Sequence, residues 1–238
     1  MKTQGAYQLK LQELKLDFKV LKEIIRVGLP AAIQQMITSI SNVFVQSYIN
    51  IFGADVMAGW SAYTKIDAFM ILPMQSISLA ITTFVGQNYG ANKMERVKKG
   101  TTSAILMSIL VTIILMIPIV VLAPVWVGLF NKDGAVLEYG VLLLRMLSPF
   151  YPLCCVNQIY ASVLRGLGDS KTPMIIMLGS FVVFRQVYLY IASHLSGTLI
   201  PIALGYPMGW LVASVMIYSY YKLKWKNRLQ INLTIEID

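Results

Sequence analysis

The hydrophobic residues of this chain lie in long stretches that contain no Asp, Glu, Lys or Arg. The longest of these stretches cover 27–54, 68–92, 100–131 and 186–221, and the last has 36 residues. About 20 apolar residues cross a bilayer as an α-helix, and lipid offers no hydrogen-bond partners to a free backbone. The pattern therefore predicts an all-α integral membrane protein.

Turn signals divide the stretches into six spans. Ser196 and Gly197, followed by Pro201, interrupt the 36-residue stretch, which is too long for one crossing. Thr172 is the expected N-cap of the fifth span, with Pro173 at its first position. We predict a bundle over 24–222, with transmembrane helices at about 24–50, 56–86, 100–125, 136–164, 173–194 and 200–222.

The segments outside the bundle are short and basic. We expect 1–23 to be a cytoplasmic segment, in which Asp17 caps a helix that lies at the membrane interface and runs into the first span; a solvated loop up to Asp17 is the alternative. Residues 223–238 should form a cytoplasmic tail. Basic residues gather in these two segments and in the loops after the second and fourth spans, whereas the opposite loops hold only Lys132. By the positive-inside rule, we expect both termini to face the cytoplasm. We expect the membrane to be the plasma membrane.

Composition supports a membrane protein rather than a nucleic-acid-binding one. The chain is 57% hydrophobic and 13% charged, whereas soluble domains have about 25% charged residues. A net charge of +9 could indicate nucleic acid, but no basic segment belongs to a soluble module large enough to bind it. We expect membrane lipid as a partner, and no nucleic acid.

Four ionisable residues fall at membrane depth, where a charge costs about 3 kcal/mol and is a functional hypothesis by default. They are Lys65, Asp67, Arg145 and Arg185. Asp67 could bind a proton, a cation or a cationic substrate, with Lys65 setting its charge state. Alternatively, these residues form structural pairs between spans, such as Asp67 with Arg145.

Polar uncharged residues recur at helical spacing in the first and fourth spans. Because lipid-facing surfaces disfavour amide groups, each stripe faces either a hydrated cavity or a neighbouring helix. Pro73, Pro118 and Pro124 should bend or break their helices. The first stripe is Gln35, Thr38, Asn42 and Gln46, beside Gln34, and the second is Tyr151, Cys155, Gln158 and Ser162.

Enzymatic sites are poorly supported. The only histidine, His194, lies at a predicted span end, so the chain offers neither a HExxH zinc site nor a Ser/His pair at membrane depth. No GxxxxGK[ST] segment is present. Cys154 and Cys155 are adjacent in an apolar stretch and are interpreted as packing residues. We expect no metal and no bound cofactor.

Two predicted cytoplasmic loops carry the most specific motifs. Residues 84–91 are FVGQNYGA, with Arg96 shortly after, and residues 163–174 are VLRGLGDSKTPM. These segments, together with GLP at 28–30 and LRMLSPFY at 144–151, resemble the multidrug and toxic compound extrusion (MATE) family. Glycines here permit tight helix exits, and Asp169 should cap or brace its loop. The motif residues are Gly86, Gln87, Asn88, Gly90, Arg165, Gly166, Gly168, Asp169 and Pro173.

The resemblance implies an antiporter that expels organic, often cationic, compounds using a sodium or proton gradient. The family has twelve spans in two six-helix lobes, and this chain resembles the C-terminal lobe. Its expected partner is an N-terminal lobe or a second half-transporter. Some members place coupling carboxylates in the first and fourth spans of this lobe. Here the first span has Gln34 and Gln35, so Asp67 is the candidate within the lobe, and coupling could equally reside in the other half.

Two alternatives remain from the sequence. One is a lipid-linked precursor flippase of the same superfamily, in which Lys65, Arg145 and Arg185 attract pyrophosphate. The other is a non-transporting membrane scaffold or a gene remnant.

Overall fold

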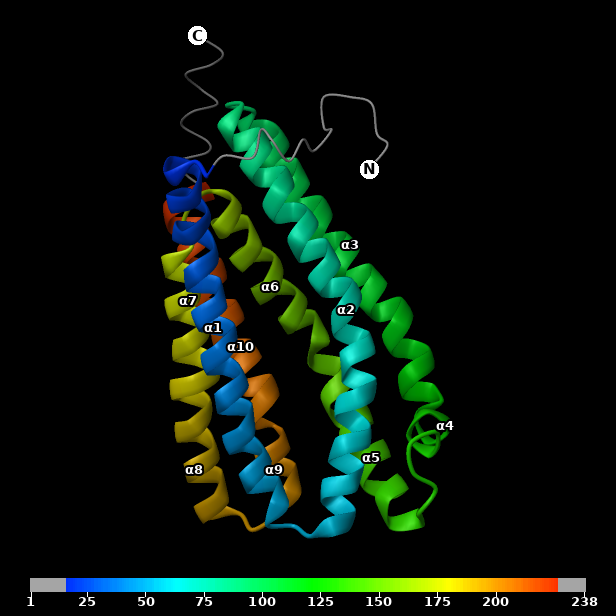
Figure 1. Ribbon diagram of the computed structural model, residues 1–238. Helices are drawn as coiled ribbons and strands as arrows, with labels where there is room; N and C mark the ends of the chain where they lie inside the picture. The colour runs from blue at the N-terminus through cyan, green and yellow to red at the C-terminus, as the bar shows by residue number, and fades with distance from the viewer. Residues whose placement is uncertain (1–15, 227–238) are drawn as a thin grey trace.

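The structure is a computed structural model that describes residues 16–226, and it is a bundle of helices with no strand in that range (Figure 1). The predicted segments at 1–15 and 227–238 lie outside the described residues. The helices are α1 (Phe18–Asn50), α2 (Ala54–Gly90), α3 (Met94–Val121), α4 (Ala123–Gly128), α5 (Gly134–Leu147), α6 (Tyr151–Gly166), α7 (Lys171–Leu178), α8 (Arg185–Leu195), α9 (Leu199–Ala203) and α10 (Gly205–Tyr220). The 3-10 segment η2 (Ser148–Phe150) joins α5 to α6, and the π-helical segment η3 (Gly179–Phe184) joins α7 to α8. A further π-helical segment, η4 (Tyr221–Lys226), follows α10.

Five helical stretches are long and apolar enough to cross a membrane. They are Ala54–Gly90, Met94–Val121, Gly134–Gly166, Lys171–Leu195 and Leu199–Trp225. The sequence predicts a sixth span in α1, which has 33 residues and is long enough. The Gln, Asn, Ser and Thr side chains of α1 lower its mean hydropathy, which separates it from the other five.

The helices form two groups connected by α6 (Figure 1). On one side α1 packs against α7 and α8, and on the other α2 packs against α3 and α5. Helix α6 contacts α2, α3 and α10, so it belongs to both groups. The start of α1 and the end of α10 lie at the same end of the bundle as the α2–α3 and α6–α7 connections.

Local signals define several helix ends. The Asp17 carboxylate accepts hydrogen bonds from the backbone N–H groups of Lys19 (2.8 Å) and Val20 (3.3 Å), which confirms the predicted cap. The predicted start of the fifth span was wrong: α7 begins at Lys171, with Ser170 rather than Thr172 at the N-cap. The Thr172 N–H lies inside the first turn and donates to the Asp169 carboxylate, at 3.2 Å.

Prolines interrupt or bend the helices where they were expected to. Helix α3 ends three residues after Pro118, and α4 begins with Pro124 in its first turn. Helix α2 continues through Pro73 for a total of 37 residues and changes direction about midway (Figure 1).

Candidate functional site

Asp67 of α2 lies half-buried between two tyrosines. The Tyr63 hydroxyl, one turn earlier on the same helix, donates to Asp67 Oδ1 at 3.5 Å. The Tyr151 hydroxyl, from the first residue of α6, donates to the same oxygen. Both donors are neutral phenols, so the carboxylate is oriented without being neutralised by a cation. Such a group can still take up a proton or a positive charge.

Five aromatic residues, here called the aromatic cluster, extend from these tyrosines. The ring centroids of Trp60 and Tyr63 are 5.4 Å apart, and those of Tyr151 and Trp210 are 5.6 Å apart. Tyr206 joins the two pairs, at 5.6 Å from Trp60 and 6.3 Å from Trp210. Aromatic faces attract organic cations. Trp60, Tyr63, Tyr151 and Trp210 are at most 8% exposed, so the cluster borders Asp67 as packed side chains of the hydrophobic core.

Arg185 of α8 lies at the far side of the cluster and is 3% exposed. Its Nη2 donates to Ser41 Oγ at 2.8 Å and to Asn42 Oδ1 at 2.7 Å, both on α1. Its guanidinium lies 4.8 Å from the centroid of the Tyr206 ring. Within residues 16–226, no carboxylate forms an ion pair with it. A continuous series of ring contacts through the aromatic cluster thus separates the buried Arg185 guanidinium from the carboxylate of Asp67.

The π-helical segment η3 positions Arg185. It ends at Phe184, directly before Arg185, and widens the helix by one backbone register. The Ser41 hydroxyl donates to the Phe181 carbonyl in this segment at 3.0 Å, and the Gln186 amide donates to Ser41 Oγ at 3.0 Å. These bonds fasten α1 to the widened turn from which Arg185 extends.

Two of the predicted charged residues do not belong to this site. Lys65 is exposed, and its Nζ lies 5.2 Å from the centroid of the Phe130 ring. Arg145 is also exposed, and its Nε donates to the Val120 carbonyl at 3.5 Å. Residues two positions apart on a helix face different directions, so Lys65 does not flank Asp67. The pair of Asp67 with Arg145 is not formed.

The polar stripe of the first span serves several contacts. Gln34 is buried and accepts from Arg165 Nη2 at 3.2 Å, so it holds the end of α6. Asn42 is bonded to Arg185, whereas Gln35 is exposed.

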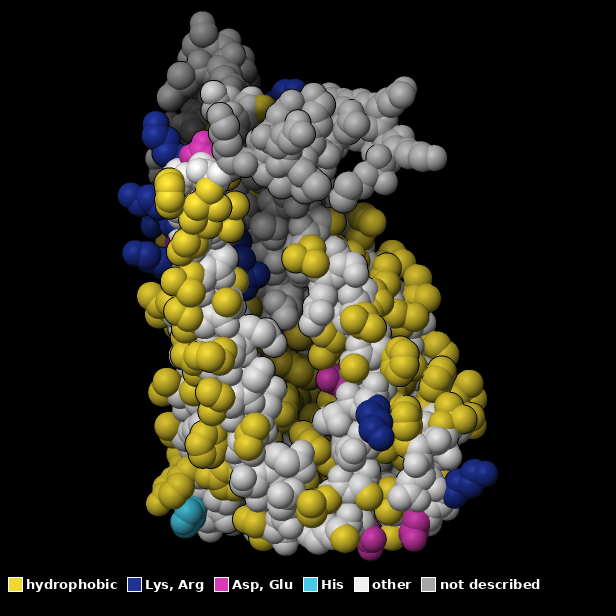
Figure 2. Space-filling view, in the orientation of Figure 1, with side chains coloured by type: hydrophobic (Ala, Val, Ile, Leu, Met, Phe, Trp, Pro, Cys, Tyr) yellow, Lys and Arg dark blue, Asp and Glu magenta, His cyan; other side chains and the backbone are white. Residues whose placement is uncertain are grey.

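Figure 2 shows the molecular surface hollowed between α1 and α2.

The stripe of the fourth span lies mostly between helices. The Cys155 thiol and the Thr112 hydroxyl are 3.2 Å apart, and the Ser162 carbonyl accepts from the Thr82 hydroxyl at 3.2 Å. Gln158 is half-buried. Cys154 and Cys155 are buried and unpaired, which agrees with their interpretation as packing residues. Only Tyr151 of this stripe reaches Asp67.

The glycines of the loop motifs have different roles from one another. A Cβ at Gly166 would lie 2.7 Å from the Thr82 carbonyl oxygen and 2.8 Å from Val85 Cβ, so this glycine lets α6 and α2 approach closely. Gly168 has φ +84° and makes the expected tight exit from α6.

The exit from α2 differs from the prediction. Gly86 lies inside α2 and Gly90 is its last residue, and the turn after the helix is made by Asn92, with φ +56°. Asn88 is buried, and its side-chain amide donates to the Phe84 carbonyl at 2.8 Å. The Gln87 carbonyl accepts from the Ala91 N–H at 3.1 Å. These bonds close the helix end that the glycines were expected to close.

Asp169 braces the α6–α7 loop, as predicted. Its carboxylate accepts from the Tyr220 hydroxyl at 2.6 Å and from the Thr172 N–H at 3.2 Å, and Lys224 Nζ lies 3.9 Å away. Burial alone would raise the pKa of this carboxyl, but the hydrogen bonds from Tyr220 and Thr172 and the charge of Lys224 outweigh burial and lower it. Pro173 is buried in the first turn of α7 beside this loop.

Sequence reasoning did not identify most of the aromatic cluster. Trp60, Tyr63 and Asp67 recur at i, i+3 and i+7 and so share one face of α2, and Tyr206 and Trp210 are one turn apart. This spacing was a usable signal. Ser41 carried no comparable signal, because its role depends on the widened turn of η3.

The comparisons with known proteins agree with the motifs. Residues 30–191 match the MatE family model. The probable multidrug resistance protein YoeA of Bacillus subtilis is 26% identical over 216 residues, which cover 90% of this chain and 47% of that protein. The probable multidrug resistance protein NorM of Thermotoga maritima is 28% identical over 155 residues, covering 65% of this chain and 33% of that protein.

Solved structures show the same fold. An outward-facing multidrug resistance MATE family transporter of the MOP superfamily superposes with a TM-score of 0.83 at 22% identity. The match covers 95% of this chain and 50% of that one. The chain thus spans about half the length of the relatives it matches. It belongs to the MATE family of multi-pass membrane transporters.

Proposed function

We propose that this chain is the C-terminal lobe of a drug-exporting antiporter. The complete protein would lie in the plasma membrane with both termini in the cytoplasm, and would export organic, often cationic, compounds in exchange for sodium or protons. The observation that carries the proposal is Asp67, held by two tyrosines against the aromatic cluster. Relatives named as multidrug resistance proteins support the class of substrate.

Exchange follows from competition for one carboxylate. The Asp67 oxygens can hold a proton or a sodium ion, or can face the positive charge of a substrate whose apolar part lies on the aromatic rings. Binding of the coupling ion removes the attraction for the substrate, and loss of the ion restores it. Each ligand thereby favours release of the other, which is the thermodynamic basis of exchange.

Alternating access requires a second bundle. In transporters built from repeats, two bundles rock against each other around a site at their interface. We infer that the hollowed surface between α1 and α2 in Figure 2 faces the other lobe or a second half-transporter. The relatives, which are about twice as long as this chain, support this inference.

The flippase alternative is not favoured by the geometry. It requires Lys65, Arg145 and Arg185 to converge on a pyrophosphate. Lys65 and Arg145 are exposed beside Phe130 and the Val120 carbonyl, and only Arg185 is at the aromatic cluster. A non-transporting scaffold would give no gradient-dependent flux in the experiment that follows.

The test uses the complete transporter that contains this chain, reconstituted into liposomes. We expect efflux of ethidium, an organic cation, to increase under an imposed sodium gradient or an imposed proton gradient, and the effective gradient identifies the coupling ion. Asp67→Asn removes the exchangeable charge while keeping the hydrogen-bond acceptor, and should lower gradient-driven efflux at least tenfold.

Asp55→Asn is the matched control, because Asp55 is exposed at the start of the same helix. It should leave efflux within twofold of the wild type. Flux that is independent of both gradients would reject antiport. If Asp67→Asn leaves gradient-driven efflux unchanged, Asp67 is not the coupling carboxylate. The antiport proposal would then stand, with the other lobe as the expected location of coupling.

A further inference from the structure

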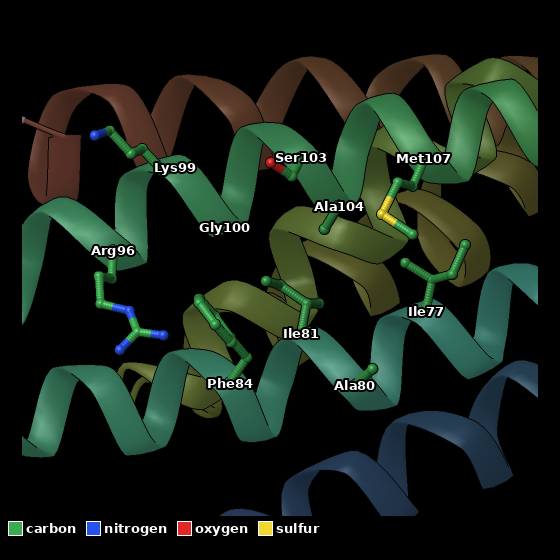
Figure 3. A pocket seen from close by; sticks show the side chains of 10 residues that line it. All are labelled: Ile77, Ala80, Ile81, Phe84, Arg96, Lys99, Gly100, Ser103, Ala104 and Met107. Atoms are coloured by element: carbon green, nitrogen blue, oxygen red, sulfur yellow. The ribbon is translucent and has the colours of Figure 1, made fainter.

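A groove separates α2 from α3 near the end at which the two helices are connected (Figure 3). Its volume is about 590 Å³, within the range of about 300–1,000 Å³ that is usual for small-molecule sites. Its length is lined by the apolar side chains of Ile77, Ala80 and Ile81 on α2 and of Ala104 and Met107 on α3. Arg96 and Lys99 lie at one end.

Small residues line the groove, and at Gly100 the Phe84 ring packs directly against α3. Gly100 has no side chain, and a Cβ there would lie 2.2 Å from Cε1 of the Phe84 ring. Ala80 and Ser103 face the same space with short side chains. The Phe84 ring is held under Arg96, whose guanidinium lies 6.0 Å from the ring centroid. The groove is thus a built feature of the α2–α3 contact.

The charged end of the groove is positive. Arg96 and Lys99 are three residues apart on α3, so they share a face, and both are exposed. Glu95 pairs with Lys99 at 2.6 Å and neutralises part of the charge, whereas Arg96 has no carboxylate partner within the described range. Beyond this end, α3 has no charged residue from 100 to its last residue.

The groove opens on a surface that would contact lipid. Leu106, Met107 and Leu110 of α3 are exposed next to it, and this helix is one of the five candidate spans. The occupant that fits is an amphiphile with a negative head at Arg96 and an apolar chain along the groove. Basic pockets between transmembrane helices on the cytoplasmic side are suited to anionic lipid head groups.

We propose that the α2–α3 groove binds one anionic phospholipid of the cytoplasmic leaflet. The lipid phosphate contacts Arg96 and Lys99, and an acyl chain lies between Ile77 and Met107. The assignment of the leaflet rests on the orientation proposed above, but lipid binding itself does not depend on transport.

The test is native mass spectrometry of the detergent-solubilised complete transporter, titrated with phosphatidylglycerol and with phosphatidylcholine of the same chains. We expect tighter binding of phosphatidylglycerol. A basic residue near an anionic lipid is worth about 1 kcal/mol, so Arg96→Gln and Lys99→Gln should each weaken that binding about fivefold. Lys93→Gln removes an exposed charge that does not line the groove and should change binding less than twofold.

A second pair of variants tests the acyl chain. Ala80→Phe and Ser103→Phe fill the groove from α2 and α3 without changing charge, and each should weaken phosphatidylglycerol binding at least fivefold. The melting temperature of each variant without lipid shows whether it is folded. If one variant fails to fold, the other is sufficient to test the acyl-chain contact. Wild-type binding in a folded groove-filling variant would overturn the proposal.

Three further results would also overturn it: equal binding of the two lipids, an equal effect of Lys93→Gln and Arg96→Gln, or displacement of the lipid by millimolar inorganic phosphate, which would indicate a free-anion site. Ethidium efflux measured on the same variants separates the two proposals. A variant that loses lipid binding but keeps ethidium efflux would show that the groove binds lipid independently of transport.

Discussion

At the scale of single residues, Gly166 allows α6 and α2 to pack closely because it has no side chain. A methyl group at this position would meet the Thr82 carbonyl at 2.7 Å and Val85 Cβ at 2.8 Å, and neither atom can move unless α6 and α2 separate. We therefore expect Gly166→Ala to lower stability by about 1–3 kcal/mol, the usual cost of overpacking. The melting temperature of the purified protein measures the change.

Gly28→Ala is the control for this substitution. Gly28 lies inside α1, and among residues 16–226 a methyl group added there would meet no atom outside its own helix within 4 Å. Replacing a helical glycine by alanine at an open position should not lower the melting temperature. Equal losses in the two variants would show that the contact with α2 is not the cause of the loss in Gly166→Ala.

The sequence predicted single residues well where one physical rule was decisive. The cost of burying charge identified Asp67 and Arg185, which both lie at the aromatic cluster. The same rule identified Lys65 and Arg145, because hydropathy reports depth but not the direction in which a side chain leaves its helix. Tyr151 lies 84 residues from Asp67 in the sequence, so their contact depended on the packing of α6 against α2.

At the scale of elements, the α6–α7 loop depends on the ionised form of Asp169. Burial opposes ionisation of this carboxyl, but hydrogen bonds from Tyr220 and Thr172 outweigh burial and lower the folded pKa. The stabilisation is therefore complete above the unfolded pKa, which is about 3.9 for Asp, and is lost as pH falls through the folded value. Asp169→Asn should cost about 1 kcal/mol at pH 7, since it weakens charge-assisted bonds.

Melting temperatures of the wild type and Asp169→Asn between pH 7 and pH 3 measure this dependence. The difference between the two proteins should be constant from pH 7 to about pH 5 and should narrow below that. Asp55→Asn, an exposed substitution on α2, is the control and should follow the wild type. A difference that stays constant down to pH 3 would show that the carboxylate charge does not brace the loop.

Apolar runs and turn residues predicted which segments are helical better than they predicted where each helix begins or where a π-helical turn occurs. The six predicted ranges each contain helix, because apolar runs of this length have no other stable form in lipid. The start of α7 was misplaced, since the Asp169 carboxylate takes the Thr172 N–H and lets the helix begin earlier. No pattern indicated η3, because a π-helical turn leaves the apolar spacing almost unchanged.

At the scale of the whole molecule, the site is open on one side. Gln35 and Asn42 are polar and exposed on α1, and exposed amides are unfavourable against lipid. A second bundle packed on this surface would cover them and close the space beside Asp67. We therefore expect the 238-residue chain expressed alone to insert into membranes but to show no gradient-driven ethidium efflux.

Co-expression with a separate six-helix lobe of the same transporter should restore that efflux. Gln35→Leu and Asn42→Leu should reduce the restoration, because they replace polar groups at the proposed contact, whereas Leu106→Val on the lipid-facing side of α3 should not. Asn42→Leu also removes an acceptor from Arg185, so Gln35→Leu, which breaks no side-chain hydrogen bond within residues 16–226, is the sharper variant. Efflux by the chain alone at the rate of the complete transporter would instead mean that two copies of this lobe assemble, or that one lobe suffices. Cross-linking through a cysteine placed at Gln35 distinguishes these outcomes, since only a pair of copies gives a dimer.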